Sequence, residues 1–249
     1  MTDRRIRISA RAVGRVELDS NDALRLEGVH AIGETYGPRT LKAFWSIGSR
    51  FERCSFENLR VEYAAFGSGK TESLYVECRL DGSELRSPAV GTARFERCSF
   101  RDVRLTDWRS SAEFVDCVFS GSARDCRFRG LREDYDTGEL HPVEFRGNDF
   151  SGMDFHDVEF REGIDLREQR LPQGPGDLYI EDAAAALGRA RERLQGWDDD
   201  DRRAKALVII DVLQEDVDVH RQEQVYVRIS DLARDPILER AIVDALEDC

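Results

Sequence analysis

Residues 143–168 read VEFRG, NDFSG, MDFHD and VEFRE, then a single Gly163, and then IDLRE, so this stretch repeats every five residues. A period of five fits neither an α-helix, which repeats about every 3.6 residues, nor a β-strand, which repeats about every 2. It does fit a chain that winds around a square and points one side chain inward on each side. The side chains expected to point inward are the central residues of the units, Phe145, Phe150, Phe155, Phe160 and Leu166.

The same five-residue unit occurs upstream. Residues 49–68 contain four units and residues 78–107 contain six, and further units lie at 112–121 and 126–130. The hexapeptide FERCSF occurs twice, and both copies begin and end on central phenylalanines. Repeats of this kind are typical of stacked structural units that bury their apolar face only against a neighbour. The frame breaks at three places, which are residues 107–111, 122–125 and 131–142.

The consecutive units VEFRG-NDFSG-MDFHD-VEFRE resemble the pattern of the pentapeptide-repeat family, in which a small residue precedes Asp or Asn, then Leu or Phe, then two variable residues. The resemblance covers roughly residues 49–168, with Glu accepted beside Asp, although Arg or Ser replaces the acid in units such as CSFRD and VRLTD. It implies a mainly β fold, a right-handed parallel β-helix with four sides and four units in each coil. In such a solenoid the central Phe and Leu residues form stacked columns along the axis.

The placement of cysteine supports this register. Five of the six cysteines lie two residues before a central apolar residue, and the sixth, Cys249, is the last residue. That position faces inward at a corner and requires a small side chain, which a free cysteine supplies. The chain has no CxxC pairing, so we expect buried thiols and neither a disulfide framework nor a metal site. The five cysteines are Cys54, Cys78, Cys98, Cys117 and Cys126.

We expect three regions along the chain. Residues 1–48 are interpreted as an N-terminal cap that merges into irregular first coils. Residues 49–170 form the solenoid with an insertion at 131–142, and residues 171–249 form a helical domain after the turn-rich linker LPQGPG. The N-terminal region contains apolar residues that partly alternate as in a half-buried strand, namely Ile6, Ile8, Val13, Val16 and Leu18.

The C-terminal region has the composition of helices at residues 180–195, 202–218 and 236–247, with the acidic run at 198–201 separating the first two. Asp235 is a suitable N-cap for the last helix, and Pro236 suits its first turn. The segment QVYVRI at 224–229 is compatible with a strand or with a helix. The last helix carries an apolar stripe that either closes the end of the solenoid or forms an exposed face for homodimerisation or docking; it includes Ile237, Leu238, Ile242 and Leu246.

The formal net charge of −13 is unevenly distributed. Residues 1–170 hold 31 acidic and 27 basic residues, whereas residues 171–249 hold 19 and 10. This acidic balance argues against direct nucleic-acid binding, because contacts to phosphates need clustered cations. The sequence has no apolar run of about 18 residues and no secretory signal peptide, which favours a cytoplasmic protein without a membrane span. Nearly all basic residues are arginine, which is typical of a bacterial genome rich in G and C.

The residue patterns do not indicate catalysis, and we expect no enzyme activity, cofactor or metal. The sequence GSGKT at 67–71 resembles the end of a phosphate-binding P-loop, but Ala64 stands where that motif needs glycine, so we interpret it as a loop between coils. The histidines are scattered, and His156 is expected on a solvated face. Asp149, Asp154 and Glu159 occupy the acidic position of the repeat, where hydrogen bonds to turns are expected.

The longest break in the repeat, LREDYDTGELHP at 131–142, is the strongest candidate for partner binding, because insertions in a solenoid project from one face. A neutral insertion is the alternative interpretation. The candidate contact residues are Arg132, Glu133, Asp134, Tyr135, Asp136, Glu139 and His141.

The sequence favours a non-enzymatic protein-interaction or scaffold protein that binds a protein partner. The resemblance to the pentapeptide-repeat family implies an alternative, a DNA mimic that modulates or protects a type II topoisomerase such as gyrase through an acidic face. Arginines in many outward positions weigh against this alternative. A second alternative is an enzyme or regulatory subunit whose activity lies in the C-terminal helical domain.

Overall fold

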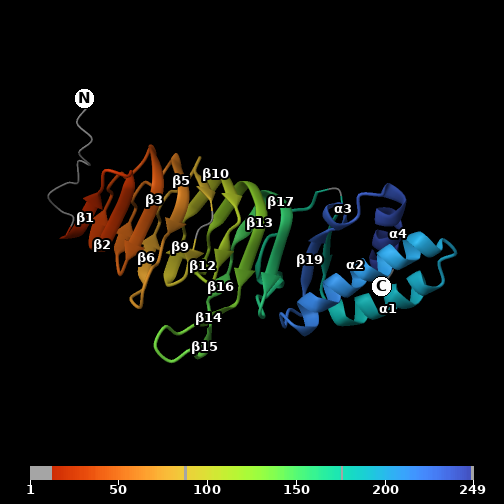
Figure 1. Ribbon diagram of the computed structural model, residues 1–249. Helices are drawn as coiled ribbons and strands as arrows, with labels where there is room; N and C mark the ends of the chain where they lie inside the picture. The colour runs from red at the N-terminus through yellow and green to blue at the C-terminus, as the bar shows by residue number, and fades with distance from the viewer. Residues whose placement is uncertain (1–12, 87–88, 175, 248–249) are drawn as a thin grey trace.

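The computed structural model describes residues 13–86, 89–174 and 176–247 and consists of a parallel β-solenoid followed by a small helical module (Figure 1). The rod runs from β1 at one end to β17 at the other, and the module continues its long axis (Figure 1). The predicted parallel β-solenoid with C-terminal helices is therefore confirmed.

The solenoid strands form one large sheet that wraps around the rod in the order β16-β12-β9-β6-β4-β2-β3-β5-β7-β10-β13-β11-β8, with β1 on β2 and β17 on β13. Their bounds are β1 Val13–Leu18, β2 Ala23–Ile32, β3 Arg39–Ile47, β4 Arg50–Glu52, β5 Leu59–Ala65, β6 Ser73–Val76, β7 Glu84–Arg86, β8 Ala89–Val90, β9 Ala93–Glu96, β10 Ser99–Thr106, β11 Arg109–Ser110, β12 Glu113–Val115, β13 Val118–Arg129, β16 Phe145–Arg146 and β17 Asp149–Arg161. A separate hairpin consists of β14 Leu131–Glu133 and β15 Leu140–Pro142, and the short 3₁₀ helix η1 spans Leu166–Glu168.

The strand register places residues about one coil apart directly above one another. Ala23 pairs with Ala43, and Ala43 pairs with Tyr63, so these coils contain 20 residues each. The predicted central residues then fall into vertical columns whose members are buried. One column follows the parallel pairings Leu41, Val61, Leu85, Leu105, Ala123 and Phe155.

A second column is a ladder of stacked aromatic rings. The ring centroids of Phe51 and Tyr75 are 5.0 Å apart, those of Tyr75 and Phe95 4.6 Å, and those of Phe95 and Phe114 5.1 Å. These values are close to the spacing of about 4.8 Å between neighbouring strands, so the backbone ladder and the ring stack reinforce each other. The hydroxyl of Tyr75 donates a hydrogen bond to the backbone oxygen of Phe66 at 2.9 Å, which allows a polar group in the core.

Two of the three predicted frame breaks do not interrupt the stack. The coils there are shorter, since Arg94 pairs with Glu113 and Arg104 with Ser122. Trp108, which lies in the first break, is fully buried and fills the core. The second break lies inside β13, whose residues from Ser122 onward pair continuously with β17. Only the third break, at 131–142, leaves the rod.

The cysteine positions are as predicted for the five that the structure describes. Each thiol is buried, and each donates a hydrogen bond to a backbone oxygen of the coil below at 3.3–3.8 Å. The sixth, Cys249, lies outside the described residues. Burial raises the pKa of the Cys126 thiol to about 11, which keeps it in the inert protonated form. The five buried thiols are Cys54, Cys78, Cys98, Cys117 and Cys126.

The N-terminal region contains an antiparallel strand, β1, on the first coil. The regular parallel register already begins at Ala23 in β2, so the region expected to hold irregular first coils is mostly regular. Ile6 and Ile8 lie outside the described residues, whereas Val16 and Leu18 pack on the core.

The C-terminal module comprises β18 Asp177–Ile180, α1 Ala183–Gln195, α2 Asp200–Asp218, β19 Val225–Arg228, α3 Ile229–Leu232 and α4 Pro236–Glu247. The third helix matches its predicted bounds, and Asp235 caps it by accepting a hydrogen bond from the backbone N–H of Ile237 at 2.9 Å. The predicted first helix is shorter, because its first residues belong to β18, which pairs with β19. The segment QVYVRI contains β19 and the first residue of α3.

The acidic run between the first two helices is partly helical. Asp199 is the N-cap of α2, and Asp200 and Asp201 form its first turn. Carboxylates at this position are favourable because they face the positive end of the helix macrodipole.

The module covers the end of the solenoid through polar and aromatic contacts. The side-chain oxygen of Gln222 accepts hydrogen bonds from the backbone N–H groups of Gly163 and Ile164, both at 3.1 Å. Gln224 accepts one from Leu166 at 2.6 Å, and the ring of Tyr226 packs edge-on against Phe155 at 5.6 Å. These contacts satisfy backbone donors that the last coil would otherwise leave unpaired.

The prediction that α4 presents an exposed apolar stripe is wrong for three of its four residues. Leu238, Ile242 and Leu246 are buried in the core of the module, where α4 packs on α1 and α2. Ile237 alone is exposed, with 56% of its surface accessible. The stripe packs within this chain because the module must build its own core.

Replacing Phe95 with alanine removes a fully buried ring from the aromatic ladder. We expect the free energy of unfolding to fall by about 3–5 kcal/mol, since the cavity cannot collapse between stacked strands. Urea denaturation followed by circular dichroism measures this. The exposed Tyr63→Ala variant is the control, and an equal loss there would contradict the ladder.

The division at about residue 170 remains a prediction. We expect residues 1–170 expressed alone to unfold cooperatively with a β-type spectrum, because the columns supply their own core. The melting temperature should be lower than that of the whole chain, because the contacts from Gln222, Gln224 and Tyr226 are lost. A non-cooperative thermal melt would show that the solenoid depends on the module.

Candidate partner-binding surface

The insertion at 131–142 forms an antiparallel hairpin that projects sideways from the rod (Figure 1). Leu131 pairs with Pro142 and Glu133 with Leu140. In the turn, the carboxylate of Asp134 accepts hydrogen bonds from the backbone N–H groups of Asp136 and Thr137, both at 2.9 Å. These bonds hold the pKa of Asp134 below its usual value. The hairpin is thus an ordered element with its own turn chemistry.

All seven predicted contact residues lie on this hairpin. Tyr135 at the tip has 73% of its surface exposed, and Leu140 has 56%. His141 is exposed, and its ring nitrogen Nε2 lies 4.0 Å from Glu139. The exposed acidic residues are Glu133, Asp134, Asp136 and Glu139.

Arg132 is the exception, because it is half-buried at the base of the hairpin. Its guanidinium lies 3.5 Å from the carboxylate of Glu113 and 3.7 Å from that of Glu72. Arg94 binds Glu113 as well, and it also binds Glu144 at 2.7 Å. The base of the hairpin is therefore attached to several coils, and Arg132 anchors the hairpin and is not part of its exposed tip.

Lys70 is a residue of this surface that the sequence analysis missed. It lies in the GSGKT loop, which is followed by strand β6 and not by a helix, as expected for a loop between coils. Its ammonium group forms an ion pair with Asp136 and lies 5.4 Å from the centre of the Tyr135 ring. The loop at 67–71 and the hairpin therefore support each other across three coils.

The two insertions meet because they leave the rod at the same corner. The loop at 67–71 precedes Tyr75, and the hairpin precedes Phe145. Tyr75 and Phe145 belong to one column, since β6, β9, β12 and β16 pair in that order. The signal was present in the sequence, because both insertions end shortly before central residues of the same side of the square.

Comparison with known proteins gives only distant structural similarity. No protein-family model matches the chain, and no curated protein matches its sequence. Two trypsin-treated forms of QnrB1, a plasmid-mediated fluoroquinolone resistance protein, match with TM-scores of 0.31 and 0.27 at 16% and 12% identity. The matches cover 57% of this chain and 76% and 78% of QnrB1. Full-length QnrB1 matches with a TM-score of 0.22, 12% identity and coverage of 57% and 81%.

The 20-residue coils, the five-residue units and the inward columns decide the fold. The chain folds as a pentapeptide-repeat solenoid. None of the described helices is long and apolar enough to cross a membrane.

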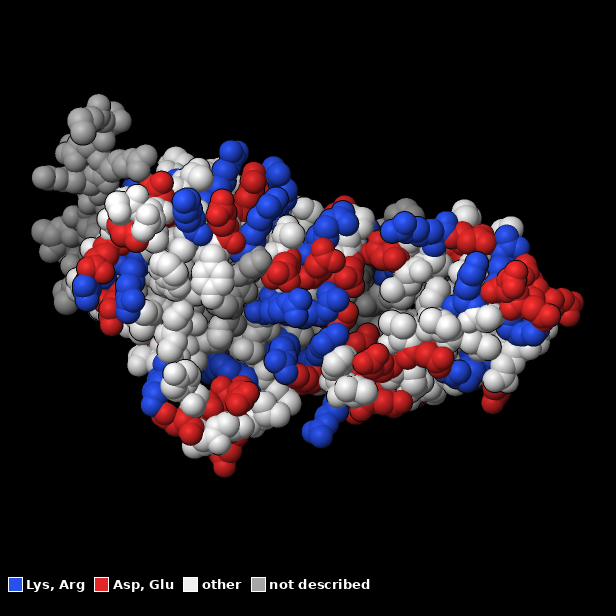
Figure 2. Space-filling model, viewed as in Figure 1, with Lys and Arg blue, Asp and Glu red and all other residues white. Residues whose placement is uncertain are grey.

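The outer surface of the pentapeptide-repeat solenoid carries ladders of opposite charge. Glu84 on one coil binds Arg104 on the next at 3.1 Å, and it lies 3.6 Å from Arg60 on the coil before. Similar pairs recur along the rod, and Figure 2 shows basic and acidic side chains interspersed on this face. At the far end of the helical module acidic side chains gather (Figure 2). The ladders leave little net charge on the coils themselves.

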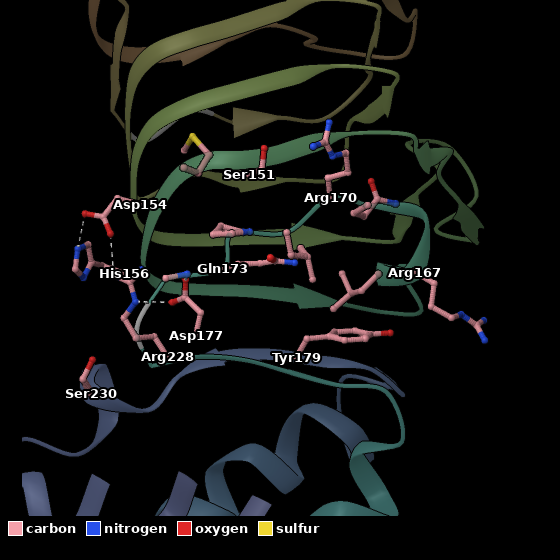
Figure 3. Close-up of a pocket in the computed structure, with 16 residues that line it drawn as sticks. Ser151, Asp154, His156, Arg167, Arg170, Gln173, Asp177, Tyr179, Arg228 and Ser230 are labelled. Atoms are coloured by element: carbon pink, nitrogen blue, oxygen red, sulfur yellow. Dashed lines mark hydrogen bonds and ion pairs between the residues drawn. The ribbon is translucent and has the colours of Figure 1, made fainter. Parts of the chain in front are cut away.

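A cavity of about 1080 Å³ opens between the last coil and the helical module. Its central cation, Arg228, binds Asp154 at 2.8 Å and the buried Asp177 at 2.7 Å (Figure 3). Burial alone would raise the pKa of Asp177, but hydrogen bonds from Arg228 and from the N–H of Gly174 lower it. The charged groups of this cavity therefore bind one another and fix the junction.

His156 does not lie on a solvated face as predicted. Its ring nitrogens lie 3.1 Å from Asp154 and 3.3 Å from Asp231 of α3, so it bridges the solenoid and the module. The acidic positions of the repeat also differ from the prediction. Asp149 accepts hydrogen bonds within its own turn as expected, whereas Asp154 and Glu159 bind arginines.

Asp216 of α2 is a buried carboxyl at the same junction. Burial, and then the neighbouring carboxylate of Glu159, raise its pKa to about 7, although Arg161 and Arg127 act in the opposite direction. The ion pair that the structure records for it, to Nε of Arg161, is 4.0 Å long. This carboxyl is therefore poorly compensated in the folded chain.

The Asp216→Asn variant should reveal this cost as a pH dependence. The folded state holds the proton up to about pH 7, whereas the unfolded state releases it near pH 4, so the intact protein loses stability as the pH rises between these values. We expect the variant to be more stable than the parent by up to about 4 kcal/mol at pH 8, and by less at pH 5. Urea denaturation at both pH values measures this difference.

Asp211→Asn is the matched control, because Asp211 lies on the same helix with 62% of its side chain exposed. Its stability relative to the parent should be the same at both pH values. If Asp216→Asn behaves like this control, Asp216 is not a buried carboxyl.

Proposed function

We propose that this protein is a non-enzymatic protein-interaction protein, and that the hairpin at 131–142 with Lys70 is its docking platform. The observation that carries this proposal is the combination of an exposed tip with a fixed base. Tyr135 and Leu140 are mostly exposed, while Arg132 and Lys70 hold the hairpin against the rod. A pre-positioned aromatic anchor binds with little loss of conformational entropy.

The chemistry of the platform indicates the kind of partner. Four exposed carboxylates surround Tyr135 and Leu140 on the hairpin. A complementary surface has an apolar depression for the aromatic ring and lysine or arginine around it, because interface energy is concentrated in buried anchors and charges at the rim guide association.

The two alternative functions receive less support. A DNA mimic needs a continuous acidic face, but residues 1–130 hold 22 basic and 19 acidic residues, and the arginine–glutamate ladders mix both charges on the rod. An enzyme in the C-terminal module needs uncommitted polar groups in a cavity. The charged groups Arg228, Asp154, Asp177 and His156 of the junction cavity already bind one another or Asp231.

The test is a photo-crosslinking experiment in a native lysate with a crosslinker placed at position 139. The protein should capture one dominant partner, and the Tyr135→Ser, Leu140→Ser double variant should bind the purified partner at least tenfold more weakly. Tyr63→Ser on the rod is the control, since Tyr63 is also an exposed tyrosine, and it should not affect binding.

Equal binding by the double variant would contradict the hairpin proposal and place the site on the rod face or the module. If the retained partner were a type II topoisomerase, the DNA-mimic alternative would replace the present one.

A further inference from the structure

A second surface feature lies at the junction between the solenoid and the module. A crevice of about 90 Å³ separates β17 from α2 and α3. Its apolar wall includes Phe155, Leu213 and Tyr226, all buried. At its rim Val212 and Leu232 are unusually exposed for apolar residues, at 47% and 39%. The volume is that of a single side chain and is too small for a folded element or a cofactor.

The crevice is acidic, and one of its carboxylates stands apart from the others. Asp157, Glu159 and Asp231 have hydrogen bonds or close ion pairs with Arg127 or His156. Arg228, the cation among the lining residues, is bound by Asp154 and Asp177 outside the crevice. Asp216 has no recorded side-chain hydrogen bond within the described residues, and its ion pair to Arg161 is 4.0 Å long.

An apolar wall that ends at a poorly compensated carboxylate matches the two parts of an arginine side chain. The aliphatic stem packs on apolar groups such as Val212 and Leu232, and the guanidinium binds a carboxylate with two N–H groups. We propose that this crevice binds an arginine side chain from residues 4–11 of a second copy of this chain.

The sequence of residues 4–11, RRIRISAR, fits the crevice by charge and by composition. It contains Arg4, Arg5, Arg7 and Arg11, and no acidic residue. Ile6 and Ile8 lie between the arginines and can cover the exposed apolar rim. The helical region at 171–249 carries 19 acidic against 10 basic residues, so the two ends of the chain are electrostatically complementary.

The same copy cannot readily supply this arginine. Residue 13 begins β1, and six strand pairings separate β2 from β17 along one side of the rod. At about 4.8 Å per pairing the separation is about 29 Å, and the crevice lies beyond β17. An extended chain covers at most about 3.6 Å per residue, so Arg7 reaches about 22 Å from residue 13 and Arg11 about 7 Å. Arg4 and Arg5 would need a fully stretched segment.

Two copies lying side by side in opposite directions solve this problem, because each copy then offers its N-terminal segment to the C-terminal crevice of the other. The two contacts are identical, as a closed two-fold dimer requires. This proposal does not depend on the hairpin platform, which lies on a different part of the surface.

The test uses sedimentation velocity of the full chain at pH 8 and low salt over a range of concentrations. The parent protein should form a dimer. Asp216→Asn, and separately a variant with Arg4, Arg5, Arg7 and Arg11 changed to Gln, should each dimerise at least tenfold more weakly. Asp211→Asn removes the same charge from an exposed position of α2 and should leave dimerisation unchanged. Thermal melts of each variant check that the fold is retained.

Mixing the two weakened variants gives the sharpest result. The Asp216→Asn copy keeps its arginines and the arginine variant keeps its crevice, so a mixed dimer has one intact contact. The mixture should therefore associate more strongly than either variant alone. A parent protein that remains monomeric, an Asp216→Asn variant that dimerises normally, or an equal loss in Asp211→Asn would overturn the proposal. Dimers that persist without the four arginines would assign the interface to another surface.

Discussion

The match between two distances governs this structure. Neighbouring strands of a sheet are about 4.8 Å apart, and stacked aromatic rings have centroids at nearly the same separation. In the ladder through Phe95 the ring centroids are 4.6–5.1 Å apart, so every coil places a ring directly on the one below. Each coil is held by its neighbours through hydrogen bonds and ring contacts at once. A residue that leaves the register disturbs both.

This constraint determines where the chain can vary. Shortened coils are tolerated where a large side chain such as Trp108 fills the space. Added residues must leave at a corner, because the sides are committed to strand pairing. The loop at 67–71 and the hairpin at 131–142 leave at the same corner of different coils and meet through Lys70 and Asp136. The rod therefore acts as a ruler that brings distant insertions together on one surface.

The end of the rod presents a different physical problem, since its last coil has donors without a following coil. Gln222 and Gln224 supply acceptors in place of that coil, and the helical module is built around them. The junction is consequently dense in charge, with Arg228 and His156 between aspartates of both parts. Asp216 is the carboxyl for which this arrangement provides least compensation, and for that reason we connect it with a partner's cation.

The repeating part of the fold could be predicted from the sequence because its signal is local and periodic. Phe95, Phe145 and the cysteines reveal their inward positions by spacing alone. The last helix was predictable from Asp235 and Pro236, which mark its start.

Contacts between segments far apart in the sequence carry no such signal. The pairing of β18 with β19, the contact of Lys70 with the hairpin and the bridge from His156 to Asp231 all depend on how separate segments are placed. The burial of Leu238, Ile242 and Leu246 was missed for a related reason. An amphipathic stripe reveals which face is apolar, but not whether the same chain covers it.

The most direct test of the stacked register is the reactivity of the cysteine thiols in the native protein toward an aromatic disulfide reagent. The account predicts that Cys54, Cys78, Cys98, Cys117 and Cys126 react only as fast as the protein unfolds, because all five are buried in one continuous core. Rapid modification of any of these five without denaturant would contradict the inward columns on which the fold and both surfaces rest.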